Sequence, residues 1–350
     1  MAGRPSGVVK ESYLSDMAFL QKRFHYVGLA SLLAFIFLVP FIESTFAPRF
    51  IMLISIFAVA LMGLNLLTSA YLFSVMHSAI MGVGGFSAAL LSQPPYNLPF
   101  FITIPLAGII AAATSVFFGL PSLRVKTFYL IFSTTAAHFI IVWILSFIVR
   151  GVPGTVVYTA PMSILGYELG ILEQYYTFII ITILMAVAIA HIGRTPLGKA
   201  LVMIGEKDYA AQVHGLSLLK YKAFAFAIAG FYGGVGGALW AYMLKLITIE
   251  HVSFELGWEM LGVGVIVGGL GSYVWGSILG ALLMRAVVDL INFTVSSLAS
   301  TMPWISQAAF GFRIIVFGAI IAVILILEPR GLAALLRKVK RFFDLWPFSY

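Results

Sequence analysis

The sequence contains no cysteine, and only 13 of its 350 residues are Asp or Glu. The absence of thiols excludes disulfides, cysteine nucleophiles and cysteine-ligated metal sites. Charged residues of both signs amount to 10% of the chain, whereas 61% of the residues are hydrophobic. Soluble domains carry about 25% charged residues, so this composition excludes an ordinary soluble domain. Apolar runs of about 18 residues or more indicate membrane-spanning helices.

The few charges that are present are mostly positive and give a net charge of +8. A basic protein can bind nucleic acid, but here Lys and Arg gather at the ends of the apolar runs. Segments 1–25, 121–126, 193–222 and 328–350 hold most of them. Loops rich in Lys and Arg stay in the cytoplasm. The charge therefore predicts orientation in a membrane lipid bilayer, with these segments inside, and no nucleic-acid partner.

The apolar runs predict an all-α polytopic membrane protein with about ten transmembrane helices and both termini on the same side. The expected spans are residues 26–42, 50–67, 74–91, 100–119, 128–149, 171–192, 223–244, 258–270, 273–298 and 304–327. The first run lacks a small-residue cleavage site near its end, so we expect a retained span and no cleaved signal peptide. The expected organisation is a cytoplasmic tail over 1–25, a transmembrane domain over 26–327 and a basic cytoplasmic tail over 328–350.

Two of the expected spans, 74–91 and 258–270, are short and rich in glycine. Short, glycine-interrupted spans in corresponding positions of two halves are typical of discontinuous helices beside a translocation path. The alternative is close helix packing through small residues. Both interpretations remain open from the sequence.

Residues 193–222 form the longest polar interruption and predict two short helices. Thr195 can cap the first, with Pro196 at its opening position, and Gly205 can end it. Glu206 and Asp208 suit the first turn of the second helix, and Gly215 can end that one. Ser217 can cap the following span, and Ala210 and Ala211 leave the second short helix narrow. We therefore expect a docking surface for another protein.

Several patterns resemble reactive sites but lack an essential part. Residues 193–199 match the front of a nucleotide-binding loop, yet Ala200 stands where Ser or Thr must hold magnesium, so the chain has no expected ATP site. The six histidines show no metal spacing; His77 and His138 can face a path or be structural. Arg285 and Asp289 lie four residues apart on one helix face and can pair, which favours a structural pair over a proton relay.

Six segments in order carry a family resemblance. They are Gly63-Leu64-Asn65-Leu66-Leu67, Ser74 to Leu90 with His77, Gly82, Gly84, Ala88 and Ala89, Pro121 to Tyr129, Gly193 to Leu201 followed by Ala210-Ala211 and Gly215, Gly268 to Ser272, and Pro329 to Leu332. Together they resemble the permeases of branched-chain amino-acid ABC importers of the LivM type. Two positions depart from the pattern: Tyr209 replaces a glutamate, and Met76 replaces a glycine.

The resemblance implies a type II ABC importer-like permease in a bacterial or archaeal cytoplasmic membrane. It implies a heterodimer with a LivH-type permease, two ATPase subunits that bind ATP and magnesium, and an external solute-binding protein. No catalytic residue, metal or cofactor is expected on this chain itself. The expected substrate path residues are Asn65, Ser74, His77, Gly82, Gly84, Gly264 and Gly268. The expected ATPase-coupling residues are Glu206, Asp208, Ala210, Ala211 and Gly215.

Branched-chain or other hydrophobic amino acids are the expected substrates, but related permeases carry urea, short amides or aromatic acids. Two other classes of protein are weaker alternatives. A secondary transporter should place an unpaired carboxylate in a span, and none is convincing here. An intramembrane enzyme should assemble a nucleophile and a base, and Ser74 with His77 lacks a third partner.

Overall fold

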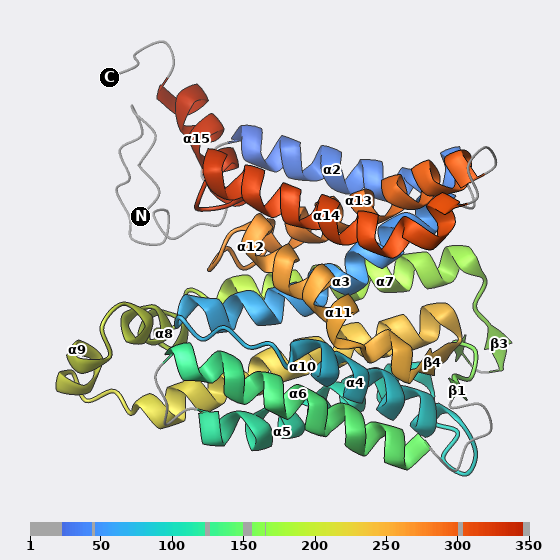
Figure 1. Ribbon diagram of the computed structural model, residues 1–350, viewed down its shortest axis with the longest axis horizontal. Helices are drawn as coiled ribbons and strands as arrows, with labels where there is room; N and C mark the ends of the chain where they lie inside the picture. Colours follow the sequence, from blue (N-terminus) through green and yellow to red (C-terminus); the bar gives the residue numbers. More distant parts are fainter. Residues whose placement is uncertain are drawn as a thin grey trace.

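The computed structural model describes residues 23–43, 46–122, 127–149, 156–164, 166–299 and 304–345. It is built almost entirely from helices (Figure 1), which confirms the all-α polytopic prediction. Helices satisfy their backbone hydrogen bonds internally, and a segment surrounded by lipid has no other partner for them. Most of the predicted N-terminal tail and the cations of the 121–126 link lie outside the described residues.

Within the described part of the chain, seven helices are long and apolar enough to cross a membrane. The long helices are α3 (Phe46–Ser69), α5 (Phe100–Ser122), α6 (Thr127–Val149), α7 (Ile171–Ile192), α10 (Leu218–Leu244), α13 (Trp275–Ala299) and α14 (Trp304–Leu327). The shorter apolar pieces are α2 (Arg23–Ile42), α4 (His77–Ser92), and the π-helical η3 (Trp258–Val263) continued by α12 (Gly264–Gly268). These elements occupy the ten predicted positions, while a count of ten full spans stays a prediction.

Short elements gather at the two ends of the long helices (Figure 1). One end carries α8 (Pro196–Glu206), α9 (Asp208–Val213) and the start of α15 (Leu332–Leu345). The other, called the strand end below, carries β1 (Val156–Tyr158), β2 (Ser163–Ile164), β3 (Tyr167–Glu168), β4 (Leu246–Thr248) and the 3-10 turn η2 (Ile249–Val252) that follows β4. Helix α11 (Phe254–Gly257) lies nearer the middle of the bundle and leads into η3.

The strands join two loops that are distant in the sequence. β1 pairs antiparallel with β4, with Val157 opposite Ile247, and β2 pairs with β3. The sequence predicted both loops on one side of the membrane, and this pairing confirms that they lie at the same end. It did not predict the strands themselves, because two or three residues are too few to show an alternating pattern.

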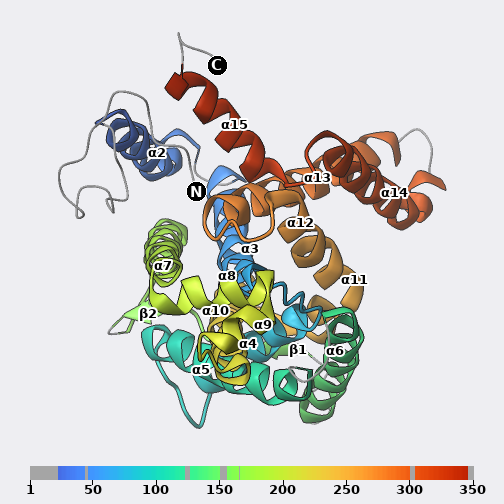
Figure 2. The same ribbon diagram turned by 90° about the vertical axis from the view of Figure 1, so that its left-hand side faces the viewer.

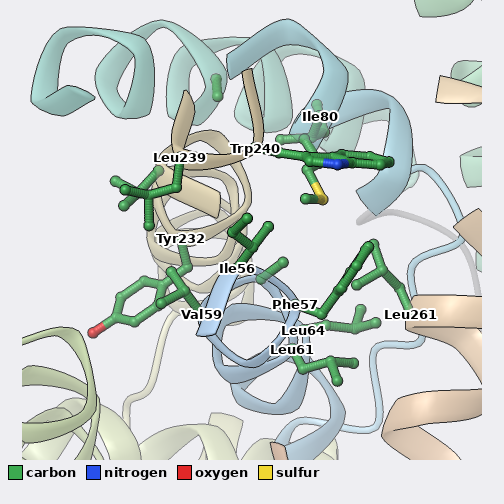
Figure 3. Packing of buried hydrophobic residues seen from close by; sticks show 14 of the residues in the cluster. Ile56, Phe57, Val59, Leu61, Leu64, Ile80, Tyr232, Leu239, Trp240 and Leu261 are labelled. Carbon is green, nitrogen blue, oxygen red and sulfur yellow. The ribbon is translucent and has the colours of Figure 1, made fainter. Parts of the chain in front are cut away.

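Helix α10 is the centre of the bundle and packs against α3, α4 and α5. Its glycines let the backbones nearly touch: a Cβ on Gly237 would lie 1.7 Å from the Met81 carbonyl oxygen, and one on Gly234 would lie 2.4 Å from the Ala111 Cβ. Figure 3 shows Tyr232, Leu239 and Trp240 of α10 beside residues of α3 and α4. Small residues of this kind allow helices to associate where the hydrophobic effect is absent.

The remaining helices surround this centre less tightly. Figure 2 shows α2 and α14 at the outside, apart from the group that contains α3, α4, α5 and α10. The Tyr175 hydroxyl of α7 donates to the Ile36 carbonyl of α2 at 2.6 Å. Helix α13 packs on α3 and on α12. Exposed apolar side chains such as Phe41 and Ile326 are the lipid-facing surface that a polytopic protein requires.

The polar segment 193–222 forms both predicted short helices, with differences at their ends. Thr195 accepts from the Gly198 N–H at 3.5 Å, as predicted for a cap. Gly205 does not end α8, which continues to Glu206. A Cβ on Gly205 would lie 2.7 Å from the Ser69 carbonyl oxygen, so this glycine permits close packing instead. Gly215 follows α9 with φ +79°, the left-handed conformation expected of a terminator.

Helix α10 begins at Leu218, which is earlier than the predicted start at 223. Ser217 occupies the capping position, but its side chain makes no capping hydrogen bond. The polar first turn of α10 therefore belongs to the helix, although it lies outside the apolar run. The end of the chain also forms a helix, α15, whose Lys338 pairs with Glu328. The sequence predicted that segment only as a basic tail.

The packing of α10 predicts a sharp difference between two glycine-to-alanine changes. Gly237→Ala should destabilise the protein by about 1–3 kcal/mol, because the methyl group overlaps the Met81 carbonyl. The control is Gly318→Ala in α14, where nothing lies within 4 Å of the added Cβ; it should be neutral or stabilising by up to about 1 kcal/mol. Thermal stability of the detergent-solubilised protein, followed by size-exclusion chromatography, measures both. Equal stability of the two variants would contradict the packing.

Candidate functional site

A small cavity lies where the two glycine-rich spans meet. It is lined by Leu64, Phe73, Ser74, Val75, His77, Ser78, Gly257, Trp258, Leu261 and Gly262. Its volume is about 10 Å³, room for about one water molecule. The structure thus brings the two short spans together beside α3. In this conformation the space is too small for an amino acid.

Ser74 belongs to a stretch of irregular backbone inside the bundle. Residues 70–76 are not helical, and α4 begins only at His77. The Val75 N–H donates to Thr134 Oγ1 on α6 at 3.2 Å, which holds this stretch in place. Irregular backbone at membrane depth is tolerated where protein surrounds it. The span is therefore discontinuous, which is one of the two interpretations that the sequence left open, and Ser74 Oγ is buried without a hydrogen-bond partner.

Both membrane histidines are held by neighbouring side chains or backbone. The Ala60 carbonyl of α3 accepts from His77 Nε2 at 2.9 Å, which fixes the proton on that nitrogen. A Cβ on Gly233 of α10 would lie 3.2 Å from the same ring. His138 Nδ1 lies 3.3 Å from Ser78 Oγ. These contacts favour the structural interpretation of both histidines, although His77 also borders the cavity.

Asn65 does not border the cavity, although the sequence placed it on the path. Its Nδ2 donates to Ser277 Oγ of α13 at 2.8 Å. Thr68, one turn later, accepts from the Gly271 N–H at 3.0 Å. These bonds tie the end of α3 to α13 and to the turn before it. A buried amide needs such partners, and the sequence does not indicate Ser277 as one because it comes from α13, more than 200 residues later.

The four path glycines of the sequence prediction also lie away from the cavity. A Cβ on Gly84 would lie 2.2 Å from the Gly234 carbonyl oxygen, and one on Gly268 would lie 2.0 Å from that of Gly276. Gly82 packs on Val252, and Gly264 packs on Leu61. The structure thus shows close packing at these four glycines. A large side chain at Gly84 or Gly268 would prevent the helices from packing, so a loss of uptake in such a variant would report on folding and not on the path. The cavity is bordered instead by Gly257 and Gly262, which the sequence did not single out for the path.

The five residues predicted to contact the ATPase lie on α9 or next to it, and they differ in how exposed they are. Ala211 is 0% exposed because α9 lays this face against its own chain, so the prediction that Ala211 enters a partner is wrong. Ala210 is half-buried, whereas Glu206, Asp208 and Gly215 are exposed. Tyr209 and Val213 are the most exposed large side chains of the segment, at 83% and 86%. The sequence pattern singled out neither for the coupling surface.

A second, larger pocket lies near the strand end, separate from the cavity at Ser74. It has a volume of about 300 Å³ and is lined by Phe46, Arg49, Phe50, Leu53, Met243, Arg285 and Asp289. Arg285 and Asp289 form the predicted ion pair on α13. Among the described residues, no group of three His, Asp or Glu side chains is placed to hold a metal ion.

Comparison with known proteins identifies relatives over most of the chain. The family model for the branched-chain amino acid transport system permease component matches residues 47–327. The high-affinity branched-chain amino acid transport system permease protein LivM of Escherichia coli is 25% identical over 280 residues, which cover 72% of this chain and 65% of that protein. The chain therefore spans less than two thirds of the length of this relative.

Two further relatives match shorter stretches. The ribose import permease protein RbsC of Haemophilus influenzae is 30% identical over 131 residues, 36% of this chain and 39% of that protein. The probable branched-chain amino acid transport permease protein LivH of Methanocaldococcus jannaschii is 27% identical over 174 residues, 48% of this chain and 50% of that protein. No solved structure matches the chain.

The structural role of His77 predicts different outcomes for two replacements. His77→Gln keeps an N–H in the place of Nε2 and should leave stability and uptake within about threefold of the parent, since it retains the bond to the Ala60 carbonyl. His77→Ala removes the donor and the ring and should cost about 2 kcal/mol or more. Thermal stability and uptake of each variant are the measurements. A stable His77→Gln variant without uptake would show instead that the imidazole carries a proton.

Proposed function

Because the chain belongs to the family of branched-chain amino acid transport system permease components, we propose that it is a transmembrane subunit of an ATP-binding cassette importer for hydrophobic amino acids. The family match over residues 47–327 carries this proposal, and the helical bundle is consistent with it. The membrane is the cytoplasmic membrane of a bacterium or archaeon. The strand end faces outside, where a solute-binding protein delivers the substrate.

The energy for transport comes from other subunits. The chain has Ala200 where a nucleotide loop needs Ser or Thr, so ATP and magnesium bind to two separate ATPase subunits. A homologous permease of the LivH type completes the membrane part. The substrate passes near the cavity at Ser74, the point where the irregular backbone before α4 meets the glycines of the second short span. A further conformation must widen this cavity, since about 10 Å³ admits no amino acid.

The proposal is tested by uptake with the assembled transporter in proteoliposomes. We expect uptake of radiolabelled leucine that requires ATP, both ATPases and the solute-binding protein. Unlabelled isoleucine and valine should compete, whereas urea, acetamide, benzoate and ribose should not. If one of these four compounds competes while isoleucine and valine do not, the substrate belongs to the class of that compound and not to the apolar amino acids. Uptake that persists without the ATPases would identify a secondary transporter.

We assign the contact with the ATPase to the exposed face of α9. Tyr209 and Val213 project large apolar surface into the surroundings, which is typical of an interaction site and not of a solvated helix. Tyrosine is also enriched among the residues that dominate interface energies. Ala211, on the opposite face, anchors α9 to its own chain, and residues 214–217 connect it directly to α10. Glu206 and Asp208 flank the exposed face, where charges adjust specificity.

The coupling assignment predicts the effect of removing this face. Tyr209→Ala together with Val213→Ala should lower the ATP hydrolysis that loaded binding protein stimulates by at least about tenfold, because large interface residues contribute about 2 kcal/mol or more each. The control is Leu184→Ala, which removes an apolar side chain with 63% exposure inside α7, away from the strand end and from α9. It should leave this stimulation unchanged. Normal stimulation in the double variant, with the permease present in the membrane, would exclude α9 as the contact.

A further inference from the structure

The pocket near the strand end is lined by two helix faces that are far apart in the sequence. Phe46, Arg49, Phe50 and Leu53 are spaced as i, i+3, i+4 and i+7, so they share one face of α3. The opposite wall comes from α13, which packs on α3. Helix α3 begins and α10 ends at the strand end (Figure 1), which puts the pocket in that half of the bundle. It is therefore distinct from the cavity at Ser74.

Arg285 and Asp289 satisfy only part of each other's hydrogen-bonding capacity. Arg285 Nη2 donates to Asp289 Oδ1. Arg285 Nε and Asp289 Oδ2 are buried and have no hydrogen-bond partner. Buried charged groups in a membrane protein are costly and normally have all their partners. One cationic donor and one anionic acceptor thus remain, four residues apart on a single helix.

The walls and the size of the pocket restrict what can use these two groups. Phe46 and Phe50 stack with their ring centroids 5.9 Å apart, and Leu53 and Met243 add further apolar surface. Arg49 supplies a second cation at the same face of α3. The volume of about 300 Å³ is at the lower end of the range of about 300–1,000 Å³ typical of ligand pockets. A small molecule with one carboxylate, one ammonium group and an apolar body matches all of these features.

We propose that this pocket binds the zwitterion of an apolar amino acid on its way through the membrane. The inference rests on the proposed function and adds the residues that recognise the substrate. The ligand carboxylate accepts from Arg285 Nε and pairs with Arg49. The ligand ammonium donates to Asp289 Oδ2, and the aliphatic side chain lies against Phe50 and Leu53. In this structure Arg285 and Asp289 bond to each other. When the ligand binds, that bond is replaced by the bonds of both side chains to the ligand.

The chain has no cysteine of its own, so a single introduced thiol reports on one position. Leu53→Cys is placed in the pocket in the complete transporter, and its labelling by a maleimide is timed with and without leucine. Leucine should slow the labelling at least threefold. N-acetylleucine, which lacks the ammonium, and leucinamide, which lacks the carboxylate, should not. The control is Tyr167→Cys at the strand end, whose labelling leucine should leave unchanged.

The charged residues are tested in the same background. Asp289→Asn keeps the shape but removes the anion, and should raise the leucine concentration needed for protection at least tenfold. Asp289→Glu should restore part of the protection. If leucine gives no protection although the parent transporter imports it, the pocket is not the site while the proposed function stands. A parent transporter that imports no apolar amino acid overturns both.

A third outcome distinguishes the site from a subunit contact. If Asp289→Asn releases the second permease from the purified complex, the unsatisfied atoms of the pair are completed by that subunit, and the binding inference is overturned. The amount of partner permease that copurifies with each variant measures this. We expect it to equal the parent amount for Asp289→Asn and for Asp289→Glu.

Discussion

The contact on which the structure depends is the near-touching of backbones along α10. In water, burial of apolar surface would hold these helices together, but lipid tails are as apolar as the side chains. What remains is close packing and hydrogen bonding. Gly237 meets the Met81 carbonyl of α4, and Gly234 meets α5. Hydroxyl groups add to this, since Ser115 Oγ of α5 donates to the Phe226 carbonyl of α10 at 2.8 Å.

This packing separates a firm part of the molecule from a looser one. Helices α3, α4, α5 and α10 interlock through glycines, so none can slide without collision. Helices α13 and α14 and the short η3 segment are joined to them through fewer such contacts, and α2 and α14 lie at the outside (Figure 2). Both the cavity at Ser74 and the pocket at Arg285 lie on the boundary between the two parts. Relative motion of the parts would change the size of both spaces.

Hydropathy predicted the helices well because membrane insertion depends on the sum of many side chains. The expected range 171–192 coincides with α7, and the pairing of Arg285 with Asp289 followed from their spacing of four. The sequence left open whether the glycines of the two short spans line a path or allow close packing, because it does not show which backbone each one faces: Gly84 and Gly268 face carbonyls. The same limitation applies to Ala211, which turned out to face its own chain.

Helix α10 also connects the two ends of the molecule directly. It runs for 27 residues, about 40 Å at about 1.5 Å per residue, from the turn after α9 to Lys245, which precedes β4. The Thr159 N–H after β1 donates to the Lys245 carbonyl at 2.9 Å, which joins the helix to the second loop at that end. A continuous α-helix shortens very little under load. Because α10 interlocks with α3, α4 and α5, a displacement at α9 that reaches the strand pair has to carry these four helices together as one rigid body.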